Sequence, residues 1–158
     1  MTTIGLGLLW RISNYPDLNG EGGLKSSGRW HRAGSRIVYM AESPTSALVE
    51  TLVHLEVDSE DFPDSYTLLK ISVPDGIAIQ ALDPPAGADW KRDLGLTRSI
   101  GDAWLAARAT ALARVPSVIA PHTWNVLLNP EHPDTKKIEI AEVIKERFDN
   151  RLFRFGAR

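Results

Sequence analysis

The sequence predicts an α+β protein: a single domain in which a mixed β core is flanked by helices. Runs of β-prone residues recur along the chain, and helical signals interrupt them without the strict alternation of a βαβ fold. The chain has 158 residues, of which 43% are hydrophobic and 24% charged. That length and composition fit one globular domain spanning residues 1–158.

Short apolar or alternating runs predict the strands, and turn residues separate them. Pro74, Asp75 and Gly76 form one such turn, in which the glycine can accept a positive φ. We expect strands over residues 6–12, 36–41, 66–73, 77–82, 117–120, 124–128 and 138–144.

The first of two helices is predicted by Ser43 as an N-cap and Pro44 at the first helical position, and it runs to about His54. Leucines at helical spacing predict its buried stripe: Leu48, Leu52 and Leu55.

The second helix is expected to begin with a capping-box-like pattern from Ser99 to Asp102. It should continue to about Arg114, where Pro116 stops it. Residues 83–95, rich in proline, glycine and charges, predict a surface loop, and a loop of that length is often a lid or a binding edge.

Composition excludes several classes of function. The net charge is −2 with interleaved signs, which argues against a nucleic-acid-binding face. The chain has no cysteine, so disulfides, thiolate nucleophiles and zinc–sulfur sites are excluded. The four histidines lack metal-ligand spacing, so we expect no metal. With no signal-peptide pattern and no apolar run of membrane-spanning length, we expect a cytoplasmic protein.

The segment from residue 22 to 55 carries most of the chemistry. Arg29 follows a Gly/Ser-rich turn and could grip a phosphate, although an exposed turn arginine is the simpler interpretation. Tyr39 should point inward from its strand, either as a core residue or as a wall of a ring pocket. Glu50 lies off the leucine stripe, either exposed or lining a cleft, where it could bind a ribose. Together they suit a ligand with a phosphate, a flat ring and a sugar, such as NAD.

Later segments add weaker signals. Ser117 lacks a nucleophile-elbow context, so its hydroxyl is expected to hydrogen-bond rather than attack. Residues 124–133 are rich in side-chain amides, including Asn125, and are typical of a strand that leaves into an Asn-Pro turn.

Taken in chain order, these segments resemble the RES domain, a family of toxins from bacterial toxin–antitoxin pairs that is named for its Arg, Glu and Ser. The resemblance covers nearly the whole chain and is greatest to short members of the ParT type. The segments that carry it are residues 9–11, 28–30, 37–39, 43–50, 101–104, 115–117, 125–133 and 148–153.

The resemblance implies a fold like that of ADP-ribosyltransferases, with NAD as a substrate in a cleft of the β core. It implies cleavage of the nicotinamide–ribose bond and transfer of ADP-ribose to a protein, such as phosphoribosyl pyrophosphate synthetase. The alternative is an NAD phosphorylase that uses phosphate as the acceptor. It also implies an Xre-like antitoxin that blocks the active site, so direct nucleic-acid or membrane contact is not expected.

By position, the resemblance implies catalytic roles for Arg29, Tyr39, Glu50 and Ser117. We expect NAD to be bound by five residues: Arg11, Arg29, Trp30, Tyr39 and Asn125. One departure is His31, where many members have asparagine, and it is expected to change contacts at the pocket rim. Two other classes stay open: a nucleotide-binding module that leaves NAD intact, and an interaction domain that binds no nucleotide.

Overall fold

The computed structural model describes residues 2–3, 7–54 and 63–156. Within them, eight strands form one mixed sheet in the order β1-β5-β6-β7-β3-β2-β4-β8, in which β5 and β6 are parallel and the other neighbours antiparallel. The strands are β1 Thr2–Thr3, β2 Gly7–Ile12, β3 Val38–Ala41, β4 Ser65–Val73, β5 Ala78–Ala81, β6 Leu112–Pro116, β7 Trp124–Leu128 and β8 Glu139–Arg147. The helices are α1 Gly22–Lys25, α2 Pro44–His54 and α3 Leu94–Ala107, with 3-10 turns at Pro133–Lys137 and Asn150–Gly156.

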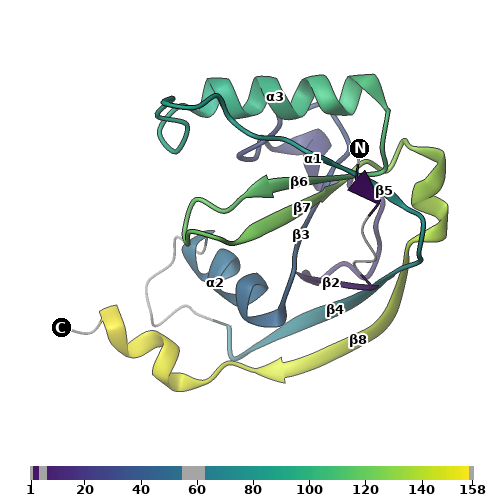
Figure 1. Cartoon of the computed structure of the whole chain (residues 1–158). Helices are drawn as coiled ribbons and strands as arrows, with labels where there is room; N and C mark the ends of the chain where they lie inside the picture. Colours follow the sequence, from purple (N-terminus) through teal and green to yellow (C-terminus); the bar gives the residue numbers. More distant parts are fainter. Residues whose placement is uncertain (1, 4–6, 55–62, 157–158) are drawn as a thin grey trace.

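In the described part of the chain, two clusters of buried apolar side chains pack against the sheet. The larger one joins residues from β2 and β4 to residues from β5 and β6, for example Leu9 and Ile71 with Ile79 and Leu112. Because these strands lie in different parts of the sheet order, the sheet must curl so that its halves share one core. Figure 1 shows this curvature, with β6 and β7 in one half and β4 and β8 in the other.

The smaller cluster packs α3 against β6 and β7. Trp104 and Leu105 of the helix meet Val115 and Leu127 of the strands, and Trp30 joins them from the turn before β3. Figure 1 shows α3 running along this part of the sheet. The predicted α+β class, with a mixed β core flanked by helices, is confirmed by this arrangement.

Most predicted strands are confirmed within a few residues. The prediction over 6–12 corresponds to β2, with Leu6 lying outside the described residues, and the one over 138–144 corresponds to the longer β8. The strand predicted over 117–120 is wrong, because these residues form a bend after β6. The Gly/Ser-rich segment before Arg29, expected to be a turn, begins with the short helix α1.

The first predicted helix is confirmed as α2, but the described leucines of its predicted stripe are only half-buried. Ala47 is the fully buried residue among its described members, whereas Leu48 and Leu52 are half-buried. Leu55 lies outside the described residues. The helix turns the side that carries Ala47 and Glu50 toward a cavity rather than toward a closed core, so apolar spacing alone overstated the burial of the leucines.

The extent of the second predicted helix is wrong. α3 begins at Leu94, where the side chain of the N-cap Asp93 accepts a hydrogen bond from the Leu96 amide at 3.0 Å. It ends at Ala107, before Arg108 in the left-handed conformation with φ of 52°. Residues expected at its C-terminal end form β6, because Leu112 and its neighbours bury completely between β5 and β7. Tertiary packing here outweighs local helix propensity.

Candidate active site

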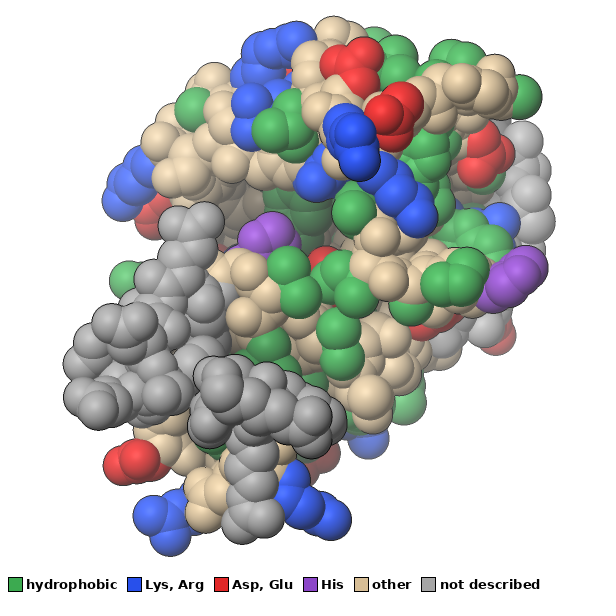
Figure 2. All heavy atoms as spheres, turned by 90° about the vertical axis from the view of Figure 1, so that its left-hand side faces the viewer, with side chains coloured by type: hydrophobic (Ala, Val, Ile, Leu, Met, Phe, Trp, Pro, Cys, Tyr) green, Lys and Arg blue, Asp and Glu red, His purple; other side chains and the backbone are tan. Residues whose placement is uncertain are grey.

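A pocket of about 440 Å³ opens beside α2, over β2, β3 and β7. Trp10, Ala41 and Asn125 are neighbours across these three strands, so their side chains share one face of the sheet. Figure 2 shows a hollow on this side of the molecule, with hydrophobic side chains in its depth and basic side chains above it. Its volume lies in the range of small-molecule sites, roughly 300–1,000 Å³. The predicted site residues that line it are Arg11, Arg29, Trp30, Tyr39, Glu50 and Asn125.

Glu50 is held in place by two donors from distant parts of the chain. Ser117 Oγ and Asn125 Nδ2 each donate to Glu50 Oε1, both at 2.9 Å. Within the described residues, Oε2 therefore keeps its lone pairs for a ligand. The carboxylate lies on a half-buried part of α2 and faces an otherwise largely apolar pocket, where a charge acts more strongly than in water.

Ser117 and Asn125 hold the same oxygen but lie differently. Ser117 is 5% exposed, is not among the described residues that line the pocket, and its Oγ also accepts from the Ile119 amide at 3.1 Å. Its geometry is that of a residue that orients Glu50 from behind. Asn125 lines the pocket itself and follows Trp124 on β7, beside Ala41 of β3.

Tyr39 is the centre of a second network. Its hydroxyl accepts from the Trp30 amide at 3.1 Å and lies 2.7 Å from His31 Nδ1. His31 Nε2 lies 3.2 Å from the carbonyl oxygen of Gly23, which can only accept. The ring therefore carries its proton on Nε2, and Nδ1 is the acceptor for the Tyr39 hydroxyl and for the Gly28 amide at 3.2 Å. Burial raises the pKa of Tyr39, so this hydroxyl keeps its proton.

His31 was expected at the pocket rim, and the structure contradicts this. The side chain is 2% exposed and lies behind Tyr39, because its two nitrogens are both engaged by neighbouring groups. The same network uses the backbone amides of Gly28 and Trp30 internally. These two amides are thus not available to a phosphate, whereas the guanidinium of Arg29 lines the pocket and keeps donors for one.

Helix α3 clamps the turn that carries Arg29. Thr97 Oγ1 donates to the Arg29 carbonyl at 2.7 Å, and Arg98 Nε donates to the Gly28 carbonyl at 2.8 Å. Asp102 accepts from the backbone amide of Arg32 at 3.0 Å and from its guanidinium at 3.1 Å. Sequence analysis missed these α3 contacts. They join residues 68–70 positions apart in the chain, so no local sequence pattern predicts them.

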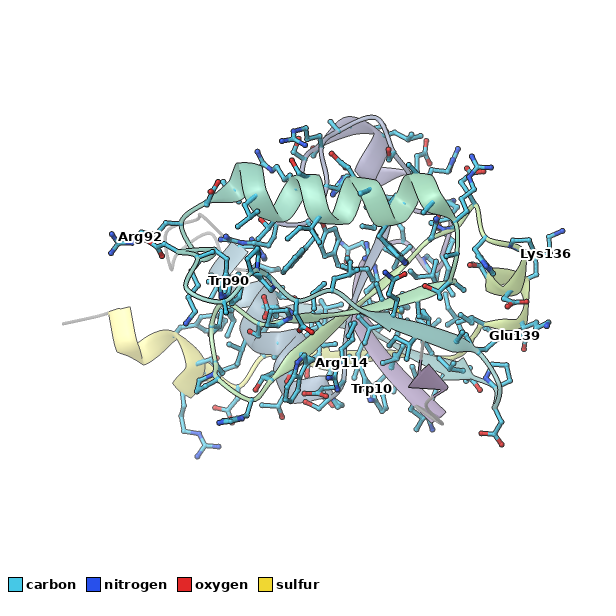
Figure 3. All side chains as sticks on the ribbon, turned by 45° about the horizontal axis from the view of Figure 1, so that its top comes forward. Trp10, Trp90, Arg92, Arg114, Lys136 and Glu139 are labelled. Atoms are coloured by element: carbon cyan, nitrogen blue, oxygen red, sulfur yellow. The ribbon has the colours of Figure 1, made fainter. Side chains whose placement is uncertain are left out.

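The loop predicted over 83–95 is confirmed as far as residue 93, since α3 begins at Leu94, and it borders the Arg29 end of the pocket. Arg29 Nη1 donates to the Lys91 carbonyl at 2.8 Å, and the rings of Trp30 and Trp90 lie 6.1 Å apart. In Figure 3, Trp90 lies within the outline of the protein, whereas Arg92 extends away from it. In the part of the chain that the structure describes, no residue of this loop lines the pocket. The loop thus orients Arg29 from the side without covering the cavity.

Arg11 lies where β2 and β3 diverge. The strands pair at Trp10 and Ala41, and Arg11 Nη1 then donates to the Tyr39 carbonyl at 3.0 Å. Burial lowers the pKa of Arg11, and Asp17 opposes this. Trp30 is 2% exposed and packs in the smaller apolar cluster, so it contributes to the pocket wall from within the core.

Two buried polar side-chain atoms in the described part of the chain lack a hydrogen-bond partner, and both belong to pocket residues. They are Arg11 Nε and Asn125 Oδ1. Buried unpaired polar groups are costly and concentrate at functional sites. In the same described ranges, no group of three or more His, Cys, Asp or Glu side chains is placed to hold a metal ion. Nor does any helix there have the length and apolarity to cross a membrane.

Comparison with solved structures identifies the class of fold. A chain of the M. tuberculosis MbcT–MbcA toxin–antitoxin complex superposes with a TM-score of 0.70. The match covers 94% of this chain and 87% of that one at 18% sequence identity. At this identity the likeness establishes a shared fold.

Comparison of sequences then identifies the family. The RES domain model matches residues 8–150, and the chain belongs to the RES domain family. Toxin Res of Pseudomonas putida is 47% identical over 148 residues, covering 92% of this chain and 99% of the relative. The Prs ADP-ribosylating toxin of Sphingobium sp. is 38% identical over 156 residues, covering 92% and 96%. The resemblance noted from the sequence is confirmed.

Proposed function

We propose that this chain is the toxin of a toxin–antitoxin pair and that it cleaves the nicotinamide–ribose bond of NAD. ADP-ribose then passes to an acceptor, for which a protein side chain is the first candidate. The observation that carries this proposal is Glu50, whose carboxylate is held by Ser117 and Asn125 with one oxygen left for a ligand. The relatives support it, since one is named as an ADP-ribosylating toxin.

The chemistry asks for charge stabilisation more than for acid catalysis. The C–N bond breaks with its electron pair going to nicotinamide, which leaves as a neutral molecule. Positive charge then develops on the ribose, and the Glu50 carboxylate stabilises it, as carboxylates do in glycoside cleavage. The acceptor forms the new bond to the ribose carbon and releases its proton to solvent.

The other pocket residues bind and orient the substrate. Arg29 holds the phosphates, with its guanidinium already directed by Lys91, and Arg11 supplies a second guanidinium from the divergence of β2 and β3. Tyr39 presents its ring to the nicotinamide or its ribose, because its hydroxyl is occupied by His31 and Trp30. We assign Trp30 to the pocket wall behind the Tyr39 ring.

The partner is a cognate antitoxin of the Xre-like type, which covers this pocket in the cytoplasm. The proposal is supported by the likeness to a chain of a toxin–antitoxin complex. A matching test is whether the co-expressed antitoxin suppresses both the toxicity and the NAD consumption of this chain.

The deciding assay follows free nicotinamide by mass spectrometry after purified protein, freed of antitoxin, meets NAD. Release only with phosphate identifies an NAD phosphorylase. Release without phosphate identifies hydrolysis, and release that requires a protein extract identifies ADP-ribosylation of a protein. NAD that binds and remains intact would reduce the chain to a nucleotide-binding module. Failure to bind NAD would favour an interaction domain.

A further inference from the structure

We infer that His31 is a positioning residue of the NAD site, and that it acts through the lone pair on Nδ1. The inference rests on the proposed function and extends it to a buried residue that does not line the pocket. Nδ1 receives the Tyr39 hydroxyl at 2.7 Å and the Gly28 amide at 3.2 Å. It therefore ties the ring wall of the pocket to the turn that carries Arg29.

The tautomer follows from the acceptors around the ring. Nε2 faces the Gly23 carbonyl at 3.2 Å, which fixes the proton on that nitrogen. A proton on Nδ1 would oppose the Gly28 amide, which is itself a donor. With Nδ1 unprotonated, the Tyr39 hydroxyl donates to it and accepts from the Trp30 amide, so both of its hydrogen-bonding directions are satisfied by the protein.

The consequence is a fixed distance between two parts of the site. Tyr39 comes from β3, and Gly28 and Trp30 come from the turn before it. Without the Nδ1 acceptor, the Tyr39 hydroxyl loses its acceptor and the turn loses its link to Tyr39 through His31. Helix α3 still holds the carbonyls of Gly28 and Arg29, so the group that we expect to shift is the Tyr39 ring, which the Trp30 amide alone would then tie to this turn.

Two substitutions distinguish the contribution of Nδ1 from that of Nε2. In His31→Asn, Oδ1 stands as many bonds from Cβ as Nδ1 does and keeps an acceptor for Tyr39 and Gly28. In His31→Gln, the side-chain amide nitrogen stands as many bonds from Cβ as Nε2 does and keeps the donor to Gly23. The Asn variant loses the Gly23 contact, whereas the Gln variant loses the Nδ1 acceptor.

The experiment compares kcat/KM for NAD and thermal stability in both variants. We expect His31→Asn to stay within about threefold of wild type in kcat/KM and His31→Gln to lose about tenfold or more, the scale of one lost buried hydrogen bond. The Gln variant leaves the Tyr39 hydroxyl without its acceptor, so we expect it to melt below the Asn variant, and both are assayed at a temperature at which they are fully folded. We expect the loss in the Gln variant to include a raised KM for NAD. A purely structural role predicts a smaller amount of active protein with the KM of wild type, and that result would overturn the inference.

A second measurement is independent of turnover. Nitrogen NMR of the labelled protein reads the His31 ring directly, and it should show a protonated Nε2 and an unprotonated Nδ1. A proton on Nδ1 would overturn the inference even if NAD is consumed. If wild-type protein leaves NAD intact, the proposed function fails. The inference about His31 is then decided by two measurements: the protonation of the ring nitrogens by NMR, and the affinities of the two variants for NAD.

Discussion

Replacing Glu50 by glutamine isolates the charge of the candidate catalytic group. In the native site, Oε1 accepts from Ser117 and Asn125, both at 2.9 Å. A glutamine oxygen can accept both bonds in the same place and leave its amide group where Oε2 was. Shape and hydrogen bonds are then kept, whereas the negative charge that faces the substrate is lost.

The expected magnitudes differ strongly between stability and rate. Changing two charge-assisted hydrogen bonds to neutral ones at a half-buried position should cost about 1 kcal/mol of unfolding free energy. For a chain of this size that lowers the melting temperature by about 2–4 °C. Loss of one electrostatic contact to the transition state typically costs roughly 10²–10³ in rate. Activity should thus fall by orders of magnitude in a protein that remains folded.

The assay measures nicotinamide release and melting temperature for wild type, Glu50→Gln and a matched control, Glu42→Gln. Glu42 is exposed, accepts from the Trp124 amide at 3.2 Å, and is absent from the described pocket lining. The control removes the same charge nearby and should keep wild-type activity. If Glu50→Gln retains more than about a tenth of the wild-type rate, the carboxylate is not the group that stabilises the developing charge.

Three further predictions concern the frame around the site. An added Cβ at Gly101 would overlap the Trp30 carbonyl, so Gly101→Ala should lower the unfolding free energy by roughly 1–3 kcal/mol. The control Gly95→Ala, in the same helix, should raise the unfolding free energy by up to about 1 kcal/mol. Equal melting temperatures of the two variants would contradict the close packing at Gly101. An added Cβ at Gly28 would overlap the Tyr39 hydroxyl and force the ring to shift, so Gly28→Ala should raise KM for NAD in a folded protein. An unchanged KM would refute this coupling. Burial raises the pKa of Tyr39 above 10.0, so above about pH 10 the unfolded chain releases a proton that the native protein retains. Denaturant titrations should show stability falling faster there in wild type than in Tyr39→Phe, and parallel curves would contradict it.

The sequence predicted the local parts of this site well. The Ser-Pro start placed α2, and spacing around the helix separated Glu50 from the leucines, which is what puts its carboxylate toward a cavity. Period-two alternation placed Tyr39 on the inner side of its strand. Both signals are local, arising within a turn or two of helix or within one strand, so a single sequence contains them.

The contacts that complete the site are not local. Ser117 and Asn125 reach Glu50 from 67 and 75 residues away, because the sheet order brings β7 beside β3. The predicted strand over 117–120 illustrates the limit. Its β-prone residues misplaced Ser117 in a strand, whereas it follows one, at the bend where its hydroxyl can turn toward α2.

Two asparagines of one segment show why residue type alone does not define a role. Asn129 is 1% exposed, and its side chain bonds the Leu105 carbonyl and the Glu131 amide, so it closes the turn after β7. Asn125, four residues earlier, donates to Glu50 from the pocket wall. Residues four apart in a strand point to the same face, so alternation does not separate these two asparagines. Their places along β7 do: Asn125 pairs with Ala41, the last residue of β3 and a pocket residue, whereas Asn129 lies beyond Leu128, where β7 ends. The place of each asparagine along the strand pair thus decides which amide belongs to the site, and that pairing depends on packing across the whole sheet.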